Sequence, residues 1–259
     1  MQLGFITSGT VDDVKFARKF GFDCLEVALF GDTPLFNDCK DFRKACDAEG
    51  IPVSAVSLFG QNYTSPDASV RKDTARRLQK MADLAAKLAA PVVITGSGSG
   101  NQDMSLQRKW NYSIEVLKPL IEKIQAKKLG FAFYNCHWEN EVNTPAAWEY
   151  VLPKLPGTGI KFDPSHPAYD NRDWTPDLLA AGPNILHAHA KDVLRVNGKL
   201  IPDPNPGLGE INWSVFFGLL YNAGYNKAVC IEPHSAVYTG DRRYAALELS
   251  GRFLRQFIL

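Results

Sequence analysis

The chain of 259 residues lacks several features that would place it in a specialised class of protein. Its five cysteines are odd in number and never form a C-x-x-C pair, which argues against a disulfide framework or a zinc–cysteine site. A net charge of +1 gives no electrostatic reason to expect nucleic acid or an anionic membrane surface. No apolar run approaches the roughly 20 residues that span a bilayer, and the start lacks the pattern of a signal peptide. We therefore expect a cytoplasmic protein with no nucleic-acid partner and no membrane partner.

The sequence does contain a regular alternation of strand and helix signals from one end to the other. Strands are predicted at 3–7, 24–29, 52–58, 91–95, 131–135, 160–163, 185–189 and 228–232. Helices are predicted at 10–20, 41–49, 69–89, 105–128, 144–152, 175–182, 213–223 and 242–257. Nothing after the first strand resembles the dinucleotide fingerprint of an open doubly wound sheet, which is the alternative arrangement. This α/β pattern predicts a single-domain (β/α)8 TIM barrel over residues 1–259.

The sixth predicted strand ends in an aspartate, a proline and a histidine. Alternation places Ile160 and Phe162 on one face, and Lys161 and Asp163 on the other. Pro164 cannot donate to a strand ladder, so the chain should leave the sheet there and carry His166 on a loop above Asp163. Taken alone, Asp163 is as well explained by capping the following turn as by a functional site.

The histidines favour the functional site, because all of them fall at or just beyond the ends of strands five to eight. They are His137, His166, His187, His189 and His234. Alternation predicts that one face of each of these strands points towards the barrel mouth. On strand five this face carries Phe131, Phe133, Asn135 and His137. On strand seven it carries His187 and His189, and on strand eight Glu232. Active sites of such barrels lie at this end.

Buried carboxylates and imidazoles at one place would cost several kcal/mol each unless they were compensated. Asp163, His189 and Glu232 form an oxygen-rich ligand set that suits one divalent ion, with Mn²⁺, Mg²⁺ or Co²⁺ favoured and Zn²⁺ an alternative. A hydrogen-bonded polar cluster without a metal is the competing interpretation.

Several motifs together resemble the xylose isomerase-like TIM-barrel superfamily. They are Asp163-Pro-Ser-His166, His187-Ala-His-Ala-Lys-Asp192, Gly207-Leu-Gly-Glu-Ile-Asn-Trp213, Gly224-Tyr225 and Ile231-Glu-Pro-His234. More narrowly, the chain is similar to sugar isomerases and epimerases of the ketose 3-epimerase and inosose dehydratase type. The resemblance implies the same barrel, a small carbohydrate substrate and one bound metal ion, with Mn²⁺ as the first candidate.

The resemblance also implies roles for particular residues. In that family a glutamate, an aspartate, a histidine and a second glutamate hold the metal, and the last three match Asp163, His189 and Glu232. His166 matches a substrate-binding histidine, and Arg195 matches an arginine that contacts substrate oxygens.

The first glutamate of the family would fall at Asn135, where this chain departs from the pattern. An asparagine carbonyl can still ligate a metal, but it cannot take a proton, which leaves one of the two bases of an epimerase in doubt.

The leading hypothesis is a metal-dependent sugar isomerase or epimerase that acts through an enediolate. The cation would bind a carbonyl and an adjacent hydroxyl and stabilise the enediolate. Glu232 would take the proton, and His137, His166 or Glu139 would act on the opposite face.

Further side chains are expected to bind the substrate. Glu26, at the end of strand two, and His187, beside His189, are expected to contact substrate hydroxyls. Trp138 is expected to form part of an apolar wall against the sugar ring, together with other aromatic residues of the mouth loops.

Three other functions stay open. A metal-dependent lyase or dehydratase needs one base, so the loss of a glutamate at Asn135 favours it. An endonuclease on the same barrel would need a multi-zinc cluster and a basic groove, which five histidines and a charge of +1 do not supply. A non-catalytic binding protein is the remaining alternative.

The last predicted helix bears on oligomeric state. Leu247, Phe253 and Phe257 would serve a homodimer contact or cover the chain's own barrel.

Overall fold

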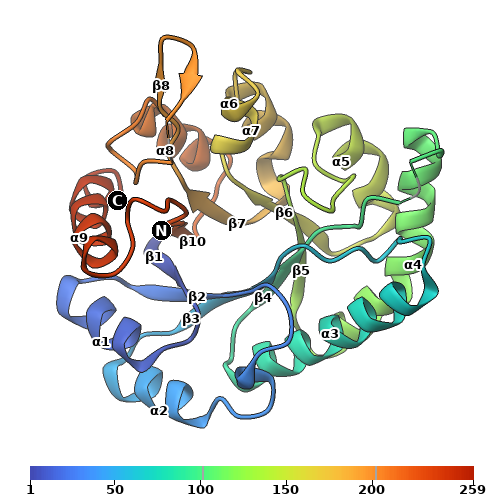
Figure 1. Cartoon of the computed structure of the whole chain (residues 1–259), viewed down its shortest axis with the longest axis horizontal. Helices are drawn as coiled ribbons and strands as arrows, with labels where there is room; N and C mark the ends of the chain where they lie inside the picture. Colours follow the sequence, from blue (N-terminus) through green and yellow to red (C-terminus); the bar gives the residue numbers. More distant parts are fainter. Residues whose placement is uncertain (101, 202) are drawn as a thin grey trace.

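The computed structural model describes residues 1–100, 102–201 and 203–259. Parallel strands close into a barrel in the order β1-β10-β7-β6-β5-β4-β3-β2, with helices around the outside (Figure 1). The barrel strands are β1 (Gln2–Thr7), β2 (Cys24–Leu29), β3 (Val53–Leu58), β4 (Val92–Thr95), β5 (Gly130–Tyr134), β6 (Thr158–Phe162), β7 (Ile185–Ala190) and β10 (Ala228–Ile231). The predicted (β/α)8 barrel is confirmed.

Local sequence signals account for the helix ends. The side chain of Thr10 accepts a hydrogen bond from the main chain of Asp13 at the start of α1, and Gly21 ends that helix with φ 74°. Gly50 ends α2 in the same way with φ 66°. The helices are α1 (Val11–Phe20), α2 (Lys40–Glu49), α3 (Ala68–Lys87), α4 (Leu106–Gln125), α5 (Pro145–Val151), α6 (Ser165–Tyr169), α7 (Thr175–Ala181), α8 (Trp213–Asn222) and α9 (Asp241–Arg255), with 3₁₀ turns at Pro34–Phe36, Leu152–Lys154 and Gly182–Asn184.

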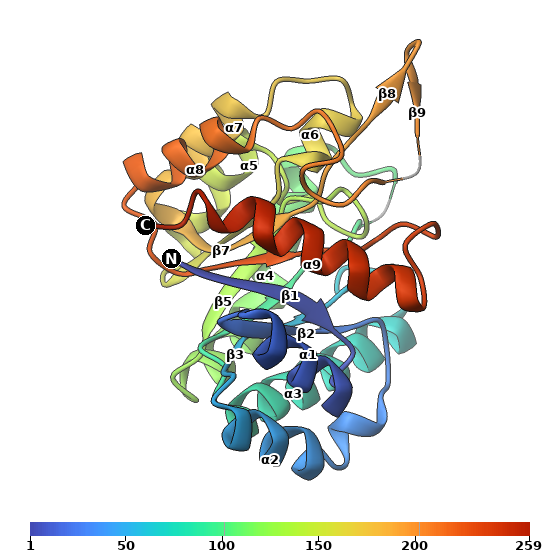
Figure 2. The same cartoon turned by 90° about the vertical axis from the view of Figure 1, so that its left-hand side faces the viewer.

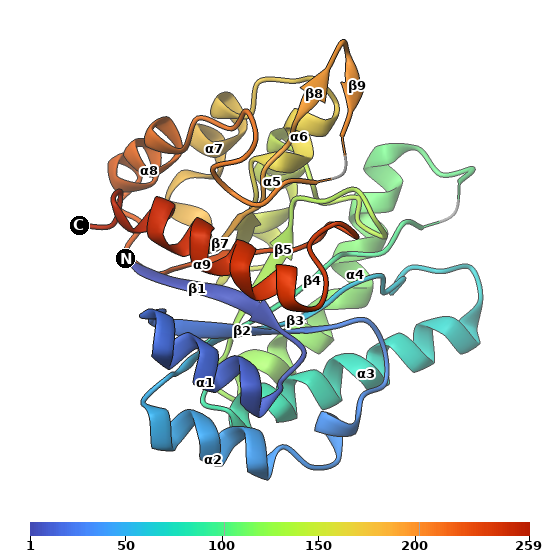
Figure 3. The same ribbon diagram turned by 60° about the vertical axis from the view of Figure 1, so that its left-hand side comes forward.

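A short helix and a hairpin near the barrel mouth were not predicted. The loop expected after Pro164 is the short helix α6, because the fixed φ of proline suits a helix start and Asp163 Oδ1 accepts a hydrogen bond from Ser165 N at 2.9 Å. The other is an antiparallel hairpin formed by β8 (Arg195–Val196) and β9 (Lys199–Leu200), which projects beyond the barrel (Figures 2 and 3). Asp163 therefore caps the turn, which is the alternative role considered for it.

The two faces of the barrel strands differ in what they contact. Ile160 and Phe162 of β6 pack in the core between barrel and helices, and Lys161 and Asp163 face the interior, as alternation predicts.

On β5 the prediction was wrong. Phe131 and Phe133 belong to the outer core, whereas Ala132 and Tyr134 face the interior, where the Tyr134 ring lies 5.3 Å from that of Phe59. By the same alternation, Asn135 lies at an outward-facing position and is not on the inward face of the strand.

Helix α9 covers its own barrel. It lies beside β1 and brings the two termini to the same side of the molecule (Figures 2 and 3). Leu247 is fully buried in the core, and the ring of Phe257 stacks on that of Phe217 at 5.6 Å. These contacts correspond to the second of the two roles considered for the helix.

A buried carboxylate organises the chain after β7. Asp192 is fully buried and accepts hydrogen bonds from five N–H groups. These donors are the main-chain N–H groups of Val193, Gly207, Gly209 and Ile211, and Trp213 Nε1, at 2.9 to 3.2 Å. The segment that leaves the barrel after Asp192 is thus fixed at both of its ends to one side chain.

Gly4 on β1 allows two cysteines to approach each other across the strand, and Gly4→Ala should be strongly destabilising. A Cβ at Gly4 would lie 2.5 Å from the carbonyl oxygen of Cys24 and 3.0 Å from Cys230 Sγ. Because the nearest atom is main chain, we expect a loss of about 2–3 kcal/mol in the free energy of unfolding. Thermal unfolding of the variant and the wild type measures this loss of stability. Gly218→Ala, at an open helical position, is the control and should stabilise by up to about 1 kcal/mol; equal stability of the two variants would contradict the packing argument.

Of the helices in the described parts of the chain, none combines the length and the apolar character that crossing a membrane requires.

Candidate functional site

A cavity of about 670 Å³ opens at the carboxyl ends of the barrel strands. This is the end where barrels of this type carry their active sites, and the volume lies in the range of small-molecule pockets. Its polar lining includes Lys161, His166, Lys191 and Glu232, and Trp138 contributes to its apolar lining.

The floor of this cavity holds two buried lysines between two carboxylates. Lys161 Nζ lies 3.5 Å from Asp163 Oδ2 and 4.0 Å from Glu232 Oε2. Lys191 Nζ lies 3.7 Å from Glu232 Oε1 and 3.9 Å from Asp163 Oδ2. Lys161 and Asp163 are completely buried, and Lys191 is almost so. Two ammonium groups therefore face two carboxylates within ion-pair distance.

Neighbouring histidines and lysines keep both carboxylates ionised. Burial raises the pKa of Asp163, but His166, Lys161 and Lys191 outweigh it and lower the pKa to about 2. Burial likewise raises the pKa of Glu232, and Lys191 together with the hydrogen bond from His189 holds that pKa well below its usual range. At neutral pH Glu232 is thus a carboxylate that can accept a proton.

His189 bridges Glu232 to a second, deeper carboxylate. Its Nδ1 lies 2.8 Å from Glu232 Oε2, and its Nε2 lies 2.6 Å from Glu26 Oε2. Because carboxylates only accept hydrogen bonds, both ring nitrogens donate. Burial lowers the pKa of His189, but the charge of Glu26 outweighs burial and raises it, which agrees with a protonated ring.

Glu26 forms the layer below the site. It is fully buried and accepts hydrogen bonds from His187 Nε2 at 2.7 Å, from His189 Nε2 and from Ser57 Oγ. Burial raises the pKa of Glu26, but the attraction of His189 and His187 lowers it below the usual range. Glu26 therefore fixes the orientation of His189 from beneath.

His166 lies at the edge of the same cluster. Its Nε2 is 3.4 Å from Asp163 Oδ2, and its ring lines the cavity. Burial and the positive charge of Lys191 lower the pKa of His166 well below its usual value, so the ring is neutral at pH 7. A neutral imidazole can both take and return a proton.

An aromatic wall stands on another side of the cavity. The ring of Phe30 stacks on those of Phe59 at 5.6 Å and Trp138 at 6.4 Å. Phe30 is 68% exposed and Trp138 is 49% exposed, so apolar faces are presented to whatever enters. Such faces suit the C–H face of a sugar or an attached apolar group.

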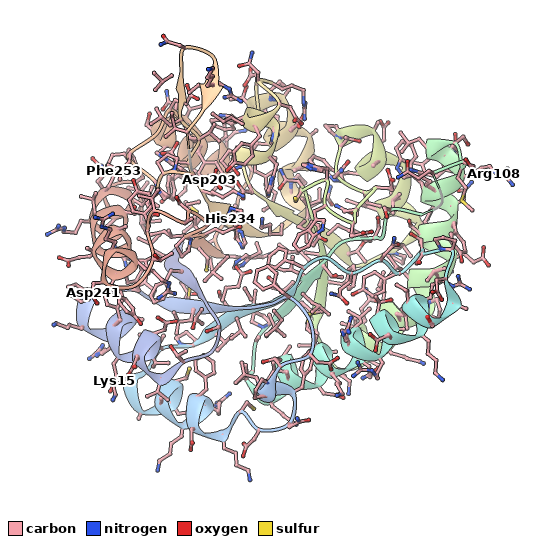
Figure 4. The ribbon with its side chains drawn as sticks, in the orientation of Figure 1. Lys15, Arg108, Asp203, His234, Asp241 and Phe253 are labelled. Atoms are coloured by element: carbon pink, nitrogen blue, oxygen red, sulfur yellow. The ribbon has the colours of Figure 1, made fainter. Side chains whose placement is uncertain are left out.

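A hydrogen-bonded pair closes the cavity below the hairpin. His234 Nδ1 lies 2.7 Å from Asp203 Oδ2, and Figure 4 shows the two side chains next to each other. Both line the cavity. The hydrogen bond with Asp203 raises the pKa of His234.

The family follows from a comparison with known protein families. A profile described as "xylose isomerase-like TIM barrel" matches residues 14–256, which is nearly the whole chain. The chain belongs to the xylose isomerase-like TIM-barrel family. The resemblance seen in its motifs is thereby confirmed.

Individual members of this family are distant from the chain. It is 24% identical over 234 residues to D-psicose 3-epimerase of Ruminiclostridium cellulolyticum, with 85% of the chain and 76% of that protein covered. Its fold matches 3-keto-D-glucoside 4-epimerase of E. coli with a TM-score of 0.80, 16% identity and 99% of each chain covered. It also matches a zinc-bound structure of the IolI protein with a TM-score of 0.82, 17% identity, and coverage of 100% of this chain and 98% of the other.

Three of the four metal ligands predicted for this xylose isomerase-like barrel converge. Donor atoms of Asp163, His189 and Glu232 lie within 4.8 Å of one another, a spacing that could hold a metal ion. Glu26, His187 and Cys230 form a second such group, fully buried below the first. The position of the first three donors thus fits the predicted cation.

The fourth predicted ligand, Asn135, is placed elsewhere. Its Nδ2 donates to the carbonyl oxygen of Asp163 at 2.8 Å, and its Oδ1 accepts from Asp163 N at 3.0 Å. The carboxamide acts as an additional strand partner that holds the end of β6. The inward side chain of β5 is Tyr134, whose register partner is Lys161. The carboxamide of Asn135 is thus engaged by the main chain of Asp163 in this structure, and its role as a metal ligand stays a prediction.

The charges around the three converging donors do not fit a divalent ion. Lys161 Nζ is within 4.0 Å of two of the donor side chains, and both nitrogens of the third, His189, are already hydrogen-bonded to carboxylates. Two unit charges 4 Å apart interact by about 4 kcal/mol at an effective dielectric constant of 20, and a divalent ion doubles that repulsion. The donor positions fit the predicted metal, whereas the ammonium groups oppose it.

Two predicted contacts lie away from the cavity. Arg195 donates to the carbonyl oxygens of Ala168 and Tyr169 at 2.5 and 2.7 Å, so it fixes α6 and is not part of the cavity lining. The Glu139 carboxylate accepts from Ser99 Oγ at 2.5 Å in the glycine-rich loop after β4 and is likewise not part of the lining. Their roles in substrate binding and proton transfer stay predictions, and neither side chain contributes to the cavity lining in this structure.

The other predicted residues divide into two layers. His137, His166, Trp138 and Glu232 line the cavity and stay candidates for substrate contact or proton transfer. Glu26 and His187 are buried and do not line it, and Glu26 is hydrogen-bonded to both His187 and His189; their contact with substrate hydroxyls stays a prediction.

Two lysines were missed, although the sequence carried a signal for them. Alternation places Lys161 with Asp163 on β6 and Lys191 with His189 after β7, both on the inward face. Lysine side chains are usually exposed to solvent, so a lysine at an inward barrel position is a signal of function. Asp203 gave no comparable pattern, because it reaches the site from an irregular segment, whereas its partner His234 was among the histidines noted at the strand ends.

Proposed function

We propose that the chain is a sugar isomerase or epimerase that moves a proton at a carbon beside a carbonyl group, through an enediolate. The observation that carries the proposal is the position of the Glu232 carboxylate, which lines the cavity 4.0 Å from Lys161 Nζ and 3.7 Å from Lys191 Nζ. A base next to cations is the arrangement that enolisation requires, because negative charge develops on the carbonyl oxygen as the proton leaves.

The roles follow from position. Glu232 takes the proton, the electron pair of the broken C–H bond forms the C=C bond of the enediolate, and the electron pair of the C=O double bond moves to the carbonyl oxygen. His166 or His137, both of which line the cavity, returns a proton to the enediolate. His189 holds Glu232 in place through a hydrogen bond, and Glu26 in turn holds His189.

Metal dependence, with Mn²⁺ as the first candidate ion and Mg²⁺, Co²⁺ or Zn²⁺ as alternatives, stays a prediction of the sequence. The ligands would be Asp163, His189 and Glu232. None of the roles given above depends on the ion, because the ammonium groups of Lys161 and Lys191 already supply positive charge at this place.

The names of the similar proteins support a keto-sugar as substrate. One is an epimerase of D-psicose and another an epimerase of a 3-keto-D-glucoside. We propose a ketohexose or a keto-glycoside as the substrate class for this chain. Cytoplasmic location and a homodimer stay predictions of the sequence.

A lyase is the second candidate, and the aromatic wall favours it. Phe30, Phe59 and Trp138 offer stacked, partly exposed rings that suit an apolar aglycone beside the sugar. With such a substrate, loss of the α-proton to Glu232 can be followed by expulsion of a β-substituent instead of return of the proton.

Incubation in D₂O tests the proposed function. We expect the wild-type protein to exchange one carbon-bound hydrogen of D-psicose, D-fructose or a 3-keto-glucoside for deuterium, with an isomer as product, detected by NMR and mass spectrometry. Loss of water or of an aglycone would assign the lyase reaction instead. Protein that leaves every one of these sugars unlabelled and unchanged would contradict both candidates.

A further inference from the structure

We propose that Lys161 and Lys191 bind the carbonyl oxygen of the sugar and stabilise the enediolate, so that the reaction needs no divalent cation. This inference rests on the proposed function, since it concerns the oxyanion that enolisation creates. It assigns catalytic roles to two residues that sequence patterns and family resemblance left without one.

The first argument is position. Lys161 Nζ and Lys191 Nζ each lie between 3.5 and 4.0 Å from both Asp163 and Glu232. Both lysines line the cavity next to Glu232, the proposed base, whereas Asp163 is not part of the lining. A sugar oxygen that enters between the base and the lysines therefore meets ammonium groups before it meets the deeper carboxylate.

The second argument is unused hydrogen-bonding capacity. Lys161 is completely buried, yet among the described residues its Nζ has no hydrogen-bond partner. Asp163 Oδ2, 3.5 Å away, also has none. Buried polar atoms are normally satisfied, and a group that is not points to a ligand. The three N–H donors of Lys161 are thus free for a ligand oxygen.

The third argument is charge. Asp163 and Glu232 carry two negative charges, and Lys161 and Lys191 carry two positive charges at the same place. The carboxylates are therefore already compensated inside the protein, and a divalent ion would leave this group of four with two excess positive charges. A cation supplied by the side chains is favoured over one taken from solution.

The step is balanced without any co-reactant. Glu232 removes the proton from the carbon beside the carbonyl, the C–H electron pair forms the C=C bond of the enediolate, and the C=O electron pair becomes an oxyanion held by Lys161 and Lys191. Return of a proton to carbon re-forms the carbonyl. The lysines are preorganised hydrogen-bond donors that stabilise the negative charge developing on the carbonyl oxygen.

Metal content is the first test. Wild-type protein produced in manganese-supplemented medium should contain far less than one equivalent of divalent metal per chain by plasma mass spectrometry. It should also bind Co²⁺ weakly, by absorbance. The double variant Lys161→Met with Lys191→Met leaves the carboxylates uncompensated, so it should bind Co²⁺ at least tenfold more tightly. Stoichiometric metal in the wild type, or no gain in the double variant, would overturn the proposal whatever sugar is turned over.

Deuterium exchange after chelation is the second test, with D-psicose, D-fructose and a 3-keto-glucoside as probes. Protein stripped with a chelator should exchange at the full wild-type rate. Lys161→Met and Lys191→Met should each lower that rate about a hundredfold or more, as loss of an oxyanion-stabilising donor does. Lys15→Met is the control, because Lys15 points away from the barrel on α1 (Figure 4), and it should leave the rate unchanged.

The outcomes separate the two proposals. Loss of exchange on chelation that Mn²⁺ restores would overturn the role of the lysines and keep the sugar isomerase. Absence of exchange with every probe, in protein shown to be folded by circular dichroism, would overturn the proposed function and the catalytic role of the lysines with it. If Lys161→Met does not fold, Lys191→Met at the cavity surface gives the same readings.

Discussion

Glu232→Gln is expected to lower the rate of hydrogen exchange from a keto-sugar by about a thousandfold or more. General base catalysis contributes typically 10²–10⁴-fold, and glutamine cannot take a proton. The change keeps the shape of the side chain and one oxygen for the hydrogen bond with His189, now 2.8 Å from Glu232 Oε2. Single-turnover deuterium exchange, followed by NMR at saturating sugar, measures the loss.

The control for this variant is Glu210→Gln, which makes the same change in charge on an exposed residue paired with Arg195 at 3.3 Å. Its exchange rate should match that of the wild type. The melting temperature of Glu232→Gln should stay close to that of the wild type, because the site keeps its shape. Exchange at the wild-type rate in folded Glu232→Gln would remove this residue from the mechanism.

Asp192→Ala is expected to cause the largest loss of stability, about 4 kcal/mol. The carboxylate is fully buried and satisfies five N–H donors, and each buried donor left unpaired costs about 1–3 kcal/mol, partly recovered by water. Burial raises the pKa of Asp192, while the donors oppose that effect. For a chain of this size the melting temperature should fall by about 10 °C, measured by calorimetry.

Two further variants serve as comparisons for Asp192→Ala. Asp192→Asn keeps one acceptor oxygen and should lose about half as much stability. Asp83→Ala removes an exposed carboxylate paired with Lys127 at 2.8 Å, and exposed pairs contribute about 0–1 kcal/mol. If Asp192→Ala were no less stable than Asp83→Ala, the five hydrogen bonds would not hold the segment after β7.

The sequence predicted the barrel because strand alternation and helix ends are local signals. Thr10, Gly21 and Gly50 act at the positions where the pattern placed them. The site was predicted in part: Asp163, His189 and Glu232 converge as their strand positions indicate.

The error on β5 concerns which of its two faces points into the barrel. Strand β5 was assigned the wrong inward face because two phenylalanines suggested a continuous pattern, and so Asn135 was turned to the site in place of Tyr134. Arg195 and Glu139 lie outside the cavity lining for another reason. Both lie on segments after strand ends, where hairpin and loop geometry decides where a long side chain reaches.

The guanidinium of Arg195 has a consequence for the neighbouring helix. Helix α6 has five residues and would not hold together alone, because so short a helix cannot offset its loss of conformational entropy. Arg195 binds two carbonyl oxygens at its end, and Asp163 binds an N–H at its start. The hairpin, which comes later in the chain, thus holds the turn that carries His166. This part of the cavity wall is ordered only when helix α6 and the hairpin are both in place.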